Sequence, residues 1–403
     1  MTHTIENQDT VPSNWNRSGL PGWAYFSEDL FKLEQEILFR RHWQLVGHVN
    51  ALAEVGSYIT LDVANERGLV IRGSDKKIRA FHNVCRHRGS RVVADEKGKC
   101  NKSIVCPYHG WSYGLDGAMR GVARPETFPE MDKSQLGLIP LNMEIWFGFI
   151  FVKFKESSQP SVKEIMARFD HEIVDYALEE MIPVPESEWA EVVNANWKSV
   201  RDVDNEGYHV KQAHPGLHEL YGQNYNDEPY KNGTSRSVGI FNTKPSKRWS
   251  VRNYLKLLPT VKKLSTESQT RWMYAGMFPN LVFGFYPDSV IYYMEIPISA
   301  TQTIQRGGAL RYPNETRDLK IARYLSGRID RDTAKEDQML TVWSSEATKS
   351  SAYSGIILSD LEYGVKTYHD HLRKIMPVLG LKKAPTAEKM SAVNNEMLGS
   401  ILT

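Results

Sequence analysis

Cysteine is scarce in this chain of 403 residues, which contains only three. That number is too small for the disulfide framework that holds many secreted domains together. All three cysteines, Cys85, Cys100 and Cys106, lie in one short stretch of the chain. Because clustered cysteines outside a disulfide framework favour metal binding, this stretch is the first candidate for a metal site.

An excess of charge of either sign is also missing, and so is a long hydrophobic run. Lys and Arg number 50 against 48 Asp and Glu, which leaves a formal net charge of +2. Nucleic-acid and membrane-surface binding need a clustered basic excess, so we expect neither partner. The sequence contains no run of about 18 apolar residues, the length needed to span a bilayer. The polar segment Met1–Asn16 lacks the apolar core of a secretory signal. We therefore expect a cytoplasmic protein.

The composition is that of a globular protein, with 41% hydrophobic and 24% charged residues, and the length suits two domains. The stretch Ser157-Ser-Gln-Pro160 separates two regions of different pattern. We expect an N-terminal segment at 1–42 whose helix packs on the second domain, a first domain at 43–156 and a second domain at 157–403.

Short strands dominate the first domain, whereas the second mixes helices and strands. An amphipathic helix capped by Ser27 is predicted at 27–44. Turn residues and apolar runs predict strands in the first domain at 58–63, 69–72, 78–83, 103–106 and 145–152. The second domain is predicted to contain helices at 161–177, from 197, at 314–350 and at 359–376, and strands at 188–193, 271–278, 281–286 and 290–299. The fold class is therefore α+β, with an all-β first domain and an antiparallel sheet in the second.

Two short motifs in the first domain each combine one cysteine with one histidine. The chain reads Cys85-Arg-His87 and, after a spacer, Cys106-Pro-Tyr-His109. Two such loops can hold a two-iron cluster with both cysteines on one iron and both histidines on the other, which raises its potential above that of a cluster held by cysteines alone. A structural zinc site with the same mixed ligands is the alternative, although zinc fingers usually pair cysteine with cysteine. Chance proximity of core residues is a third interpretation.

A second group of metal-ligand types lies in the second domain, where the chain reads Glu206-Gly-Tyr-His209 and then His214-Pro215. On a continuous helix, Glu206 and His209 would share a face. Proline disfavours helical geometry at the preceding residue, so the helix is expected to end at His214 and leave its ring free to turn back. Two imidazoles and a distant carboxylate form the facial triad that binds non-haem Fe(II). Packing or capping, the usual role of a lone histidine, is the alternative.

With both motifs present, the chain resembles the alpha (terminal oxygenase) subunits of Rieske non-haem iron oxygenases, in the ring-hydroxylating superfamily. The similarity covers about residues 25–376 and rests on the two Cys–His motifs and the histidine segment. It implies a small all-β Rieske domain and a helix-grip (START-like) catalytic domain whose antiparallel sheet is flanked by helices. The spacer between the Rieske motifs is slightly longer than is usual in the family and contains Cys100, which we interpret as a non-ligand.

The resemblance also implies which residues hold each metal. A [2Fe–2S] cluster would be bound by Cys85, His87, Cys106 and His109. Mononuclear Fe(II) would be bound by His209, His214 and a downstream acid, for which Asp337 is the first choice. Glu336, Asp332 and Asp330 remain alternatives, because exposed carboxylates often serve solvation or helix capping.

Two more acids are candidates for a catalytic role. Glu206 matches the bridging acid that links the two metal centres in the family. Asp202 stands where the family often has asparagine, so its role stays open.

The resemblance further implies several partners. NAD(P)H electrons would arrive from a separate flavin and iron–sulfur reductase, directly or through a ferredoxin, and the substrates would be O₂ and a small molecule. Family members form head-to-tail homotrimers, in which His109 of one subunit would approach Glu206 of the next.

For the substrate, the Trp-Lys and Glu-Gly-Tyr-His-Val patterns resemble the choline, betaine and carnitine monooxygenase branch. This implies hydroxylation or oxidative N-demethylation of a small quaternary-ammonium compound. Aromatic residues crowd the second domain and could cage such a cation or simply pack on strand faces. An aromatic ring-hydroxylating dioxygenase is the alternative. A non-catalytic Rieske electron carrier is an alternative of another class, and it would lack the mononuclear iron.

Overall fold

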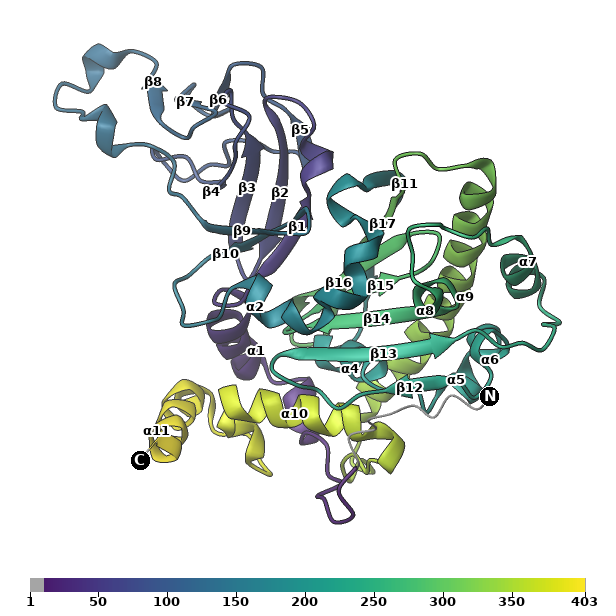
Figure 1. Ribbon diagram of the computed structural model, residues 1–403. Helices are drawn as coiled ribbons and strands as arrows, with labels where there is room; N and C mark the ends of the chain where they lie inside the picture. Colours follow the sequence, from purple (N-terminus) through teal and green to yellow (C-terminus); the bar gives the residue numbers. More distant parts are fainter. Residues whose placement is uncertain (1–10, 403) are drawn as a thin grey trace. The chain divides into compact units, whose positions relative to one another are not determined.

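The computed structural model describes residues 11–402, so most of the polar segment Met1–Asn16 lies outside the described residues. The chain divides into two compact units, which Figure 1 labels by element. The large unit comprises Met1–Glu34, Ile165–Tyr176 and Val184–Thr403. The small unit comprises Gln35–Glu164 and Ala177–Pro183. Each unit has its own sheets and its own buried core.

Three antiparallel sheets build the small unit, with the strand orders β1-β10-β9, β4-β3-β2-β5 and β6-β7-β8. The strands are β1 (Gln44–His48), β2 (Ser57–Val63), β3 (Glu66–Arg72), β4 (Ile78–His82), β5 (Lys97–Lys99), β6 (Ser103–Val105), β7 (Ser112–Gly114), β8 (Met119–Gly121), β9 (Asn142–Trp146) and β10 (Phe149–Lys153). The strands predicted at 58–63, 69–72, 78–83 and 103–106 are confirmed with small shifts at their ends.

The single strand predicted at 145–152 is wrong, because a turn divides this range into β9 and β10. Phe147 and Gly148 both have positive φ, 45° and 83°, as a two-residue hairpin turn of the primed type requires. Trp146 and Phe149 are paired directly across this turn. The turn went unrecognised because Phe147 is itself apolar and continues the hydrophobic run.

The helix predicted at 27–44 is also too long. Helix α1 spans Glu28–Glu34 and is followed by a π-helical turn at Gln35–Phe39, after which β1 begins. All five residues of β1 are buried. A strand buried on both faces shows no alternation of polar and apolar residues, so its start could not be told from the end of an amphipathic helix.

A seven-stranded antiparallel sheet forms the large unit, in the order β11-β17-β16-β15-β14-β13-β12. The strands are β11 (Ile182–Val193), β12 (Tyr225–Asp227), β13 (Thr234–Ile240), β14 (Arg271–Met277), β15 (Leu281–Phe285), β16 (Val290–Ser299) and β17 (Gln302–Arg311). The prediction of an α+β fold with an antiparallel sheet is confirmed. Three strands, β12, β13 and β17, were not predicted, because Ser, Arg, Gln and Gly interrupt their apolar pattern.

The remaining α-helices are α2 (Val162–Met166), α3 (Asp170–Ile173), α4 (Trp197–Asp204), α5 (Val210–Ala213), α6 (Pro215–Tyr221), α7 (Trp249–Leu257), α8 (Thr266–Gln269), α9 (Arg317–Ala347), α10 (Tyr363–Ile375) and α11 (Met390–Leu402). The long helix predicted at 314–350 is confirmed as α9. The helix predicted at 161–177 is instead two short helices with 3-10 turns between and after them.

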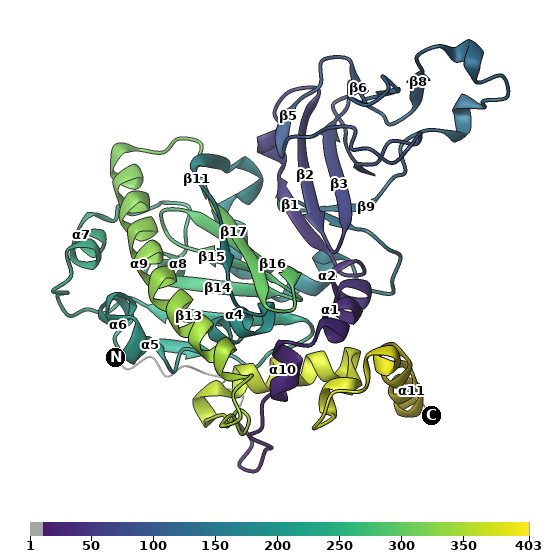
Figure 2. The same ribbon diagram turned by 180° about the vertical axis from the view of Figure 1, so that it is seen from behind.

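Helix α9 runs across one face of the seven-stranded sheet, as Figure 2 shows. Its first half buries side chains at intervals of three and four residues, among them Leu319, Ala322, Leu325 and Ile329. This spacing gives one apolar stripe. Its members Ala322, Leu325 and Ile329 pack in a core with Trp272 of β14 and Tyr286, which follows β15. The second half of α9 carries the candidate ligand Asp337.

A buried ion pair fixes the start of α4 to α1. Lys198 Nζ donates to Glu34 Oε1 at 2.5 Å, and Trp197 Nε1 donates to Glu34 Oε2 at 2.9 Å. Both charged side chains have 0% exposure. Burial lowers the pKa of Lys198, and the Glu34 carboxylate opposes that shift. The base of the segment that leads to the histidines is therefore held by a fully buried contact.

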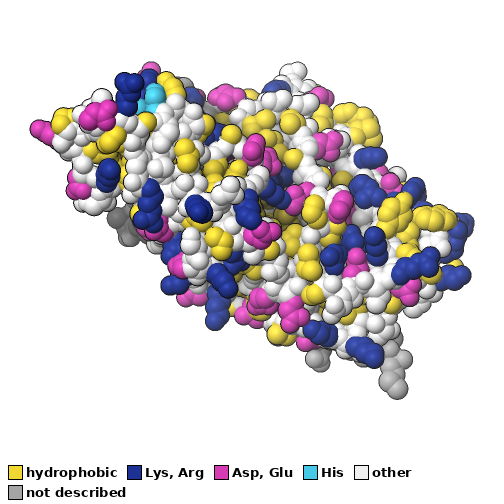
Figure 3. All heavy atoms as spheres, turned by 90° about the horizontal axis from the view of Figure 1, so that it is seen from above, with side chains coloured by type: hydrophobic (Ala, Val, Ile, Leu, Met, Phe, Trp, Pro, Cys, Tyr) yellow, Lys and Arg dark blue, Asp and Glu magenta, His cyan; other side chains and the backbone are white. Residues whose placement is uncertain are grey.

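Within the described residues, no helix is both long and apolar enough to cross a membrane. Basic and acidic side chains are interspersed over the face shown in Figure 3. This mixture agrees with the small net charge of the sequence.

Candidate metal centres

The two Cys–His motifs form two loops with the same backbone geometry. Gly89 N–H donates to the Cys85 carbonyl at 3.0 Å, and Gly110 N–H donates to the Cys106 carbonyl at 3.1 Å. Both glycines have positive φ, +73° and +69°, a conformation that side-chain-bearing residues rarely adopt. Each loop is thus a tight turn that starts at the cysteine and closes at the glycine.

The cysteines point into the core and the histidines lie beside each other. Cys85 and Cys106 are 3% and 2% exposed, and the rings of His87 and His109 are 4.6 Å apart between centroids. Burial raises the pKa of the Cys85 thiol, and the neighbouring Cys106 raises it further, while the Tyr113 hydroxyl 3.3 Å from its sulfur opposes the shift. The two cysteines are therefore neighbours, and so are the two histidines.

These residues fit a metal group better than they fit a packed core. His87 Nδ1 is buried and has no hydrogen-bond partner within the described part of the chain. An unpaired buried nitrogen is costly, and a bound metal would satisfy it. Two sulfurs and two ring nitrogens are also the donor set of a Rieske [2Fe–2S] cluster.

The histidine segment of the large unit is not one continuous helix. Asn205 ends α4, where its side chain donates to the Arg201 carbonyl at 2.8 Å, and Gly207 is a poor helix former. Helix α5 begins only after His209, its N-cap. The expectation that Glu206 and His209 share a helix face is therefore wrong, because the chain turns between them.

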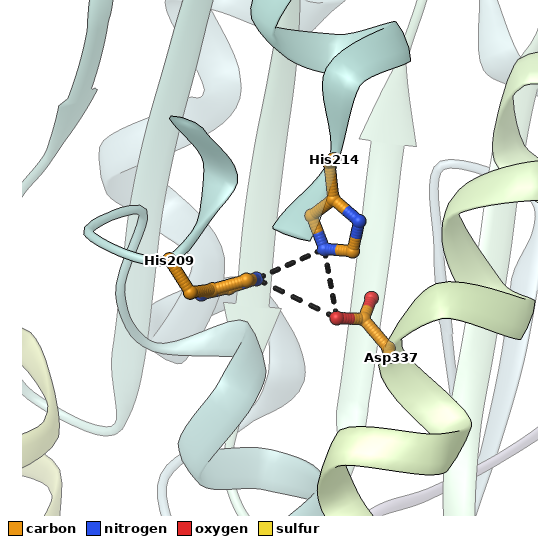
Figure 4. A group of neighbouring side chains, drawn as sticks. All are labelled: His209, His214 and Asp337. Atoms are coloured by element: carbon orange, nitrogen blue, oxygen red, sulfur yellow. Dashed lines mark hydrogen bonds and ion pairs between the residues drawn. The ribbon is translucent and has the colours of Figure 1, made fainter. Parts of the chain in front are cut away.

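His209, His214 and Asp337 nevertheless converge on one point, as Figure 4 shows. His209 Nε2 lies 3.0 Å from His214 Nε2, and Asp337 Oδ1 lies 2.8 Å from His214 Nε2 and 3.5 Å from His209 Nε2. As predicted, α5 ends before His214, and Pro215 begins α6. The three atoms come from the start of α5, the α5–α6 junction and α9.

The charges of this group suit a bound cation. Burial alone would lower the pKa of His209, but its contacts with Asp337 and Glu206 outweigh burial and raise it to about 10. Burial would raise the pKa of Asp337, yet the two histidines outweigh it and lower that pKa. The group therefore stabilises positive charge at its centre, and two imidazoles with one carboxylate are the ligands of a mononuclear Fe(II) facial triad.

Each of the two imidazoles meets a second carboxylate at its other nitrogen. Glu206 Oε1 lies 2.5 Å from His209 Nδ1, and Glu206 Oε2 also accepts the His209 backbone N–H at 3.1 Å. Glu336 Oε2 lies 2.9 Å from His214 Nδ1. The sequence had suggested Glu336 only as an alternative ligand, and its contact with the far side of His214 was missed.

Asp202 and Glu206 line a common cavity of about 320 Å³ within the large unit. Asp202 accepts hydrogen bonds from the Tyr25 hydroxyl at 2.7 Å and, with Nε2 as donor, from His369 at 2.8 Å. Tyr25 and His369 were not anticipated from the sequence, since they come from opposite ends of the chain. Glu206 therefore both contacts His209 and lines this cavity.

The other acids weighed as iron ligands lie elsewhere. Asp330 Oδ1 accepts a hydrogen bond from the Tyr286 hydroxyl at 3.0 Å, and burial raises the pKa of Asp330 to about 7. Asp332 is exposed on α9. Neither belongs to the group of atoms that His209, His214 and Asp337 bring together.

Comparison with known proteins yields matches for both units. Residues 174–378 match the ring hydroxylating alpha subunit (catalytic domain) family, and residues 42–132 match the Rieske [2Fe-2S] domain family. The glycine betaine monooxygenase oxygenase subunit of Chromohalobacter salexigens is 28% identical over 381 residues, which cover 87% of this chain and 84% of that protein. The protein of the same name from Pseudomonas aeruginosa UCBPP-PA14 is 34% identical over 209 residues, which cover 52% of this chain and 48% of that protein.

The match thus spans about half the length of the Pseudomonas relative. Among solved structures, a quaternary ammonium Rieske monooxygenase superposes with a TM-score of 0.73 at 25% identity, covering 88% of this chain and 94% of that chain. These similarities confirm the fold and the resemblance that the two motifs had indicated.

Proposed function

Because this chain belongs to the family of ring-hydroxylating alpha subunits and carries a Rieske [2Fe–2S] domain, we propose that it is the terminal oxygenase of a multicomponent monooxygenase. The observation that carries the proposal is the convergence of His209, His214 and Asp337 within one group of ligand atoms. A non-catalytic electron carrier would have no use for this second centre. The Cys–His motifs of the small unit and the group of His209, His214 and Asp337 in the large unit would together supply both metal sites that the chemistry needs.

The proposed roles follow from the chemistry of the donors. Cys85, His87, Cys106 and His109 would hold the [2Fe–2S] cluster, and His209, His214 and Asp337 would hold Fe(II). The cluster supplies electrons one at a time, and the iron, when bound, supplies the site at which O₂ is reduced. Hydroxylation of one C–H bond consumes O₂, two electrons and two protons, and it leaves one water. The electrons would come from NAD(P)H through a separate flavin and iron–sulfur reductase, directly or through a ferredoxin.

We propose a small quaternary-ammonium compound as substrate. The relatives named above are glycine betaine monooxygenase subunits. Asp330 precedes Asp337 by two turns of α9, so both lie on the same face of that helix. The Tyr274 hydroxyl lies 3.2 Å from the Tyr286 hydroxyl, which in turn donates to Asp330. Aromatic faces and a carboxylate attract a cation that has no N–H groups to donate.

This group of residues favours an ammonium substrate over an aromatic hydrocarbon. A partly buried carboxylate such as Asp330 would cost free energy beside a purely apolar ring. Not every aromatic residue is available for binding, since Trp272 and Tyr286 are stacked at 3.9 Å and fully buried. Tyr274 and Asp330, which are only partly buried, are the better candidates. Oxidation at a carbon bonded to the nitrogen would give an unstable hydroxylated product and release an aldehyde and an amine.

We further propose a homotrimer in which the cluster of one copy serves the iron of the next. Glu206 contacts His209 and also lines the cavity. Each carboxylate oxygen can accept more than one hydrogen bond, so we propose that His109 of the next copy donates to Glu206 and that electrons pass between the two centres there. On the small unit, Tyr108 beside His109 is 54% exposed. An exposed aromatic residue at the cluster tip is the kind of side chain that anchors a protein interface.

Two measurements test the proposed function. Iron analysis of the purified protein should give about three irons per chain, whereas an electron carrier would hold only the two of its cluster. With a surrogate reductase, O₂ uptake should be matched by product from glycine betaine, carnitine or choline. Product from an aromatic hydrocarbon, with none from these ammonium compounds, would replace the proposal by ring dihydroxylation.

A further inference from the structure

The carboxylate of Glu336 stands in the same relation to His214 as Glu206 does to His209. In both imidazoles Nε2 faces the centre of the candidate iron site, and Nδ1 faces a carboxylate oxygen, at 2.5 Å for Glu206 and 2.9 Å for Glu336. We propose that Glu336 is a positioning residue of the iron site, which holds the His214 ring with its Nε2 lone pair toward the metal. This inference rests on the proposed function, since it assumes that this site binds iron.

Two adjacent residues of α9 contact both ring nitrogens of His214. Asp337 Oδ1 lies 2.8 Å from His214 Nε2, while Glu336, its neighbour in sequence, reaches Nδ1 on the opposite side of the ring. The His214 side chain is 1% exposed, so it has little room to rotate away from these two contacts. Adjacent side chains on a helix point in different directions. Glu336 and Asp337 can therefore contact opposite sides of the same His214 ring.

The chemistry of the contact explains why a carboxylate is suited to Nδ1. A neutral imidazole carries one N–H, and an ionised carboxylate can only accept a hydrogen bond. Glu336 therefore stabilises the tautomer with the proton on Nδ1, which leaves the Nε2 lone pair free to bind a metal. Without Glu336 the proton could reside on Nε2, and the ring would then present a donor where a ligand is needed.

Glu336 and Glu206 have different surroundings, so we expect their substitution to affect different properties of the protein. Glu206 lines the cavity of about 320 Å³, but Glu336 is not among the residues that line it. The Glu336 side chain is instead 33% exposed at the other side of His214. Loss of Glu336 should therefore weaken metal binding and leave the proposed electron route through Glu206 in place.

The test is the binding of Co(II) to cluster-loaded protein from which the mononuclear metal has been removed, followed by the visible spectrum of the bound ion. Removal of such an outer carboxylate typically weakens metal binding by about 10–100-fold. Glu336→Ala should fall near the upper end of that range with a changed Co(II) spectrum. Glu336→Gln keeps the shape but not the charge, and should fall near the lower end.

Asp332→Asn is the matched control, because it removes the same charge from the exposed surface of the same helix. It should bind Co(II) within about twofold of the wild-type protein, since a distant exposed charge is screened by solvent. Wild-type affinity and spectrum in Glu336→Gln or in a folded Glu336→Ala protein would overturn the inference. If Glu336→Ala does not retain the cluster absorption and so has not folded, Glu336→Gln decides alone.

A second variant separates this inference from the proposed function. His209→Ala removes a proposed ligand and should abolish Co(II) binding. Undiminished binding in His209→Ala would mean that the iron site itself is wrongly assigned, and both proposals would fall. Loss of binding in His209→Ala with wild-type binding in Glu336→Gln would contradict only the role of Glu336.

Discussion

The two candidate metal centres differ in how far apart their residues lie in the sequence. Each half of the cluster motif places a cysteine and a histidine within one turn closed by a glycine. The proposed iron site instead takes its third candidate ligand, Asp337, from a helix that lies far along the chain from His209 and His214. The first centre is built by local backbone geometry, and the second depends on the packing of α9 against the sheet and the histidine segment.

The largest expected effect concerns the local centre. Cys85→Ser should abolish the visible absorption of the cluster and all product formation, because the ligand sulfur is lost from a loop that offers no substitute. The mononuclear site should still bind iron, since none of its residues lies in the small unit. Absorption spectroscopy with iron analysis checks this. An unchanged spectrum would contradict the assignment of Cys85 as a ligand of the cluster.

The distant centre should be lost just as selectively. Asp337→Ala should lower the mononuclear iron to near zero and end product formation, while the cluster remains reducible by dithionite. The Asp332→Asn protein, altered at an exposed residue of the same helix, should keep both the mononuclear iron and product formation. Normal turnover by Asp337→Ala would show that another carboxylate completes the site.

The buried ion pair between Glu34 and Lys198, which holds the start of α4, can be broken without changing any proposed iron ligand. Glu34→Ala leaves Lys198 buried without its partner, which should lower the free energy of unfolding by about 3–5 kcal/mol. Asp29→Ala removes an acid of the same helix whose partner Lys32 is 74% exposed, and it should cost less than about 1 kcal/mol. Denaturant titration followed by circular dichroism compares the two. Equal effects would mean that the buried pair does not stabilise this region.

The smallest effects should come from two glycines that are needed for different reasons. A Cβ at Gly207 would lie 2.0 Å from the Tyr225 ring, whereas one at Gly89 would meet no atom within 4 Å but would force a side chain into φ +73°. Gly207→Ala should therefore cost about 1–3 kcal/mol through overpacking and reduce the mononuclear iron. Gly89→Ala should cost about 1–2 kcal/mol through backbone strain and reduce the cluster content. Iron and sulfide analysis of both variants checks this. Loss of the cluster in Gly207→Ala, or loss of the mononuclear iron in Gly89→Ala, would contradict the prediction.

The same contrast explains what could be predicted from the sequence. The Cys–His loops and the end of α5 shortly before Pro215 follow from short-range rules, so they were visible as motifs. The contacts of Tyr25 and His369 with Asp202, and of Glu336 with His214, join residues that only the tertiary fold brings together. Local reasoning failed where a residue behaved unlike its type, as at Phe147, an apolar residue in a hairpin turn. It also failed at Asn205, whose side chain helps to end a helix that the pattern continued.

We propose that Glu206 links the two centres, and single-turnover kinetics of Glu206→Gln tests this role most directly. Glutamine is nearly the same size but presents an amide donor where the second imidazole needs an acceptor. Both metal sites should fill, and dithionite should still reduce the cluster. Stopped-flow reoxidation of the reduced cluster by O₂ with substrate should slow by orders of magnitude relative to the wild-type protein. Wild-type reoxidation rates in a fully metallated Glu206→Gln protein would contradict the claim.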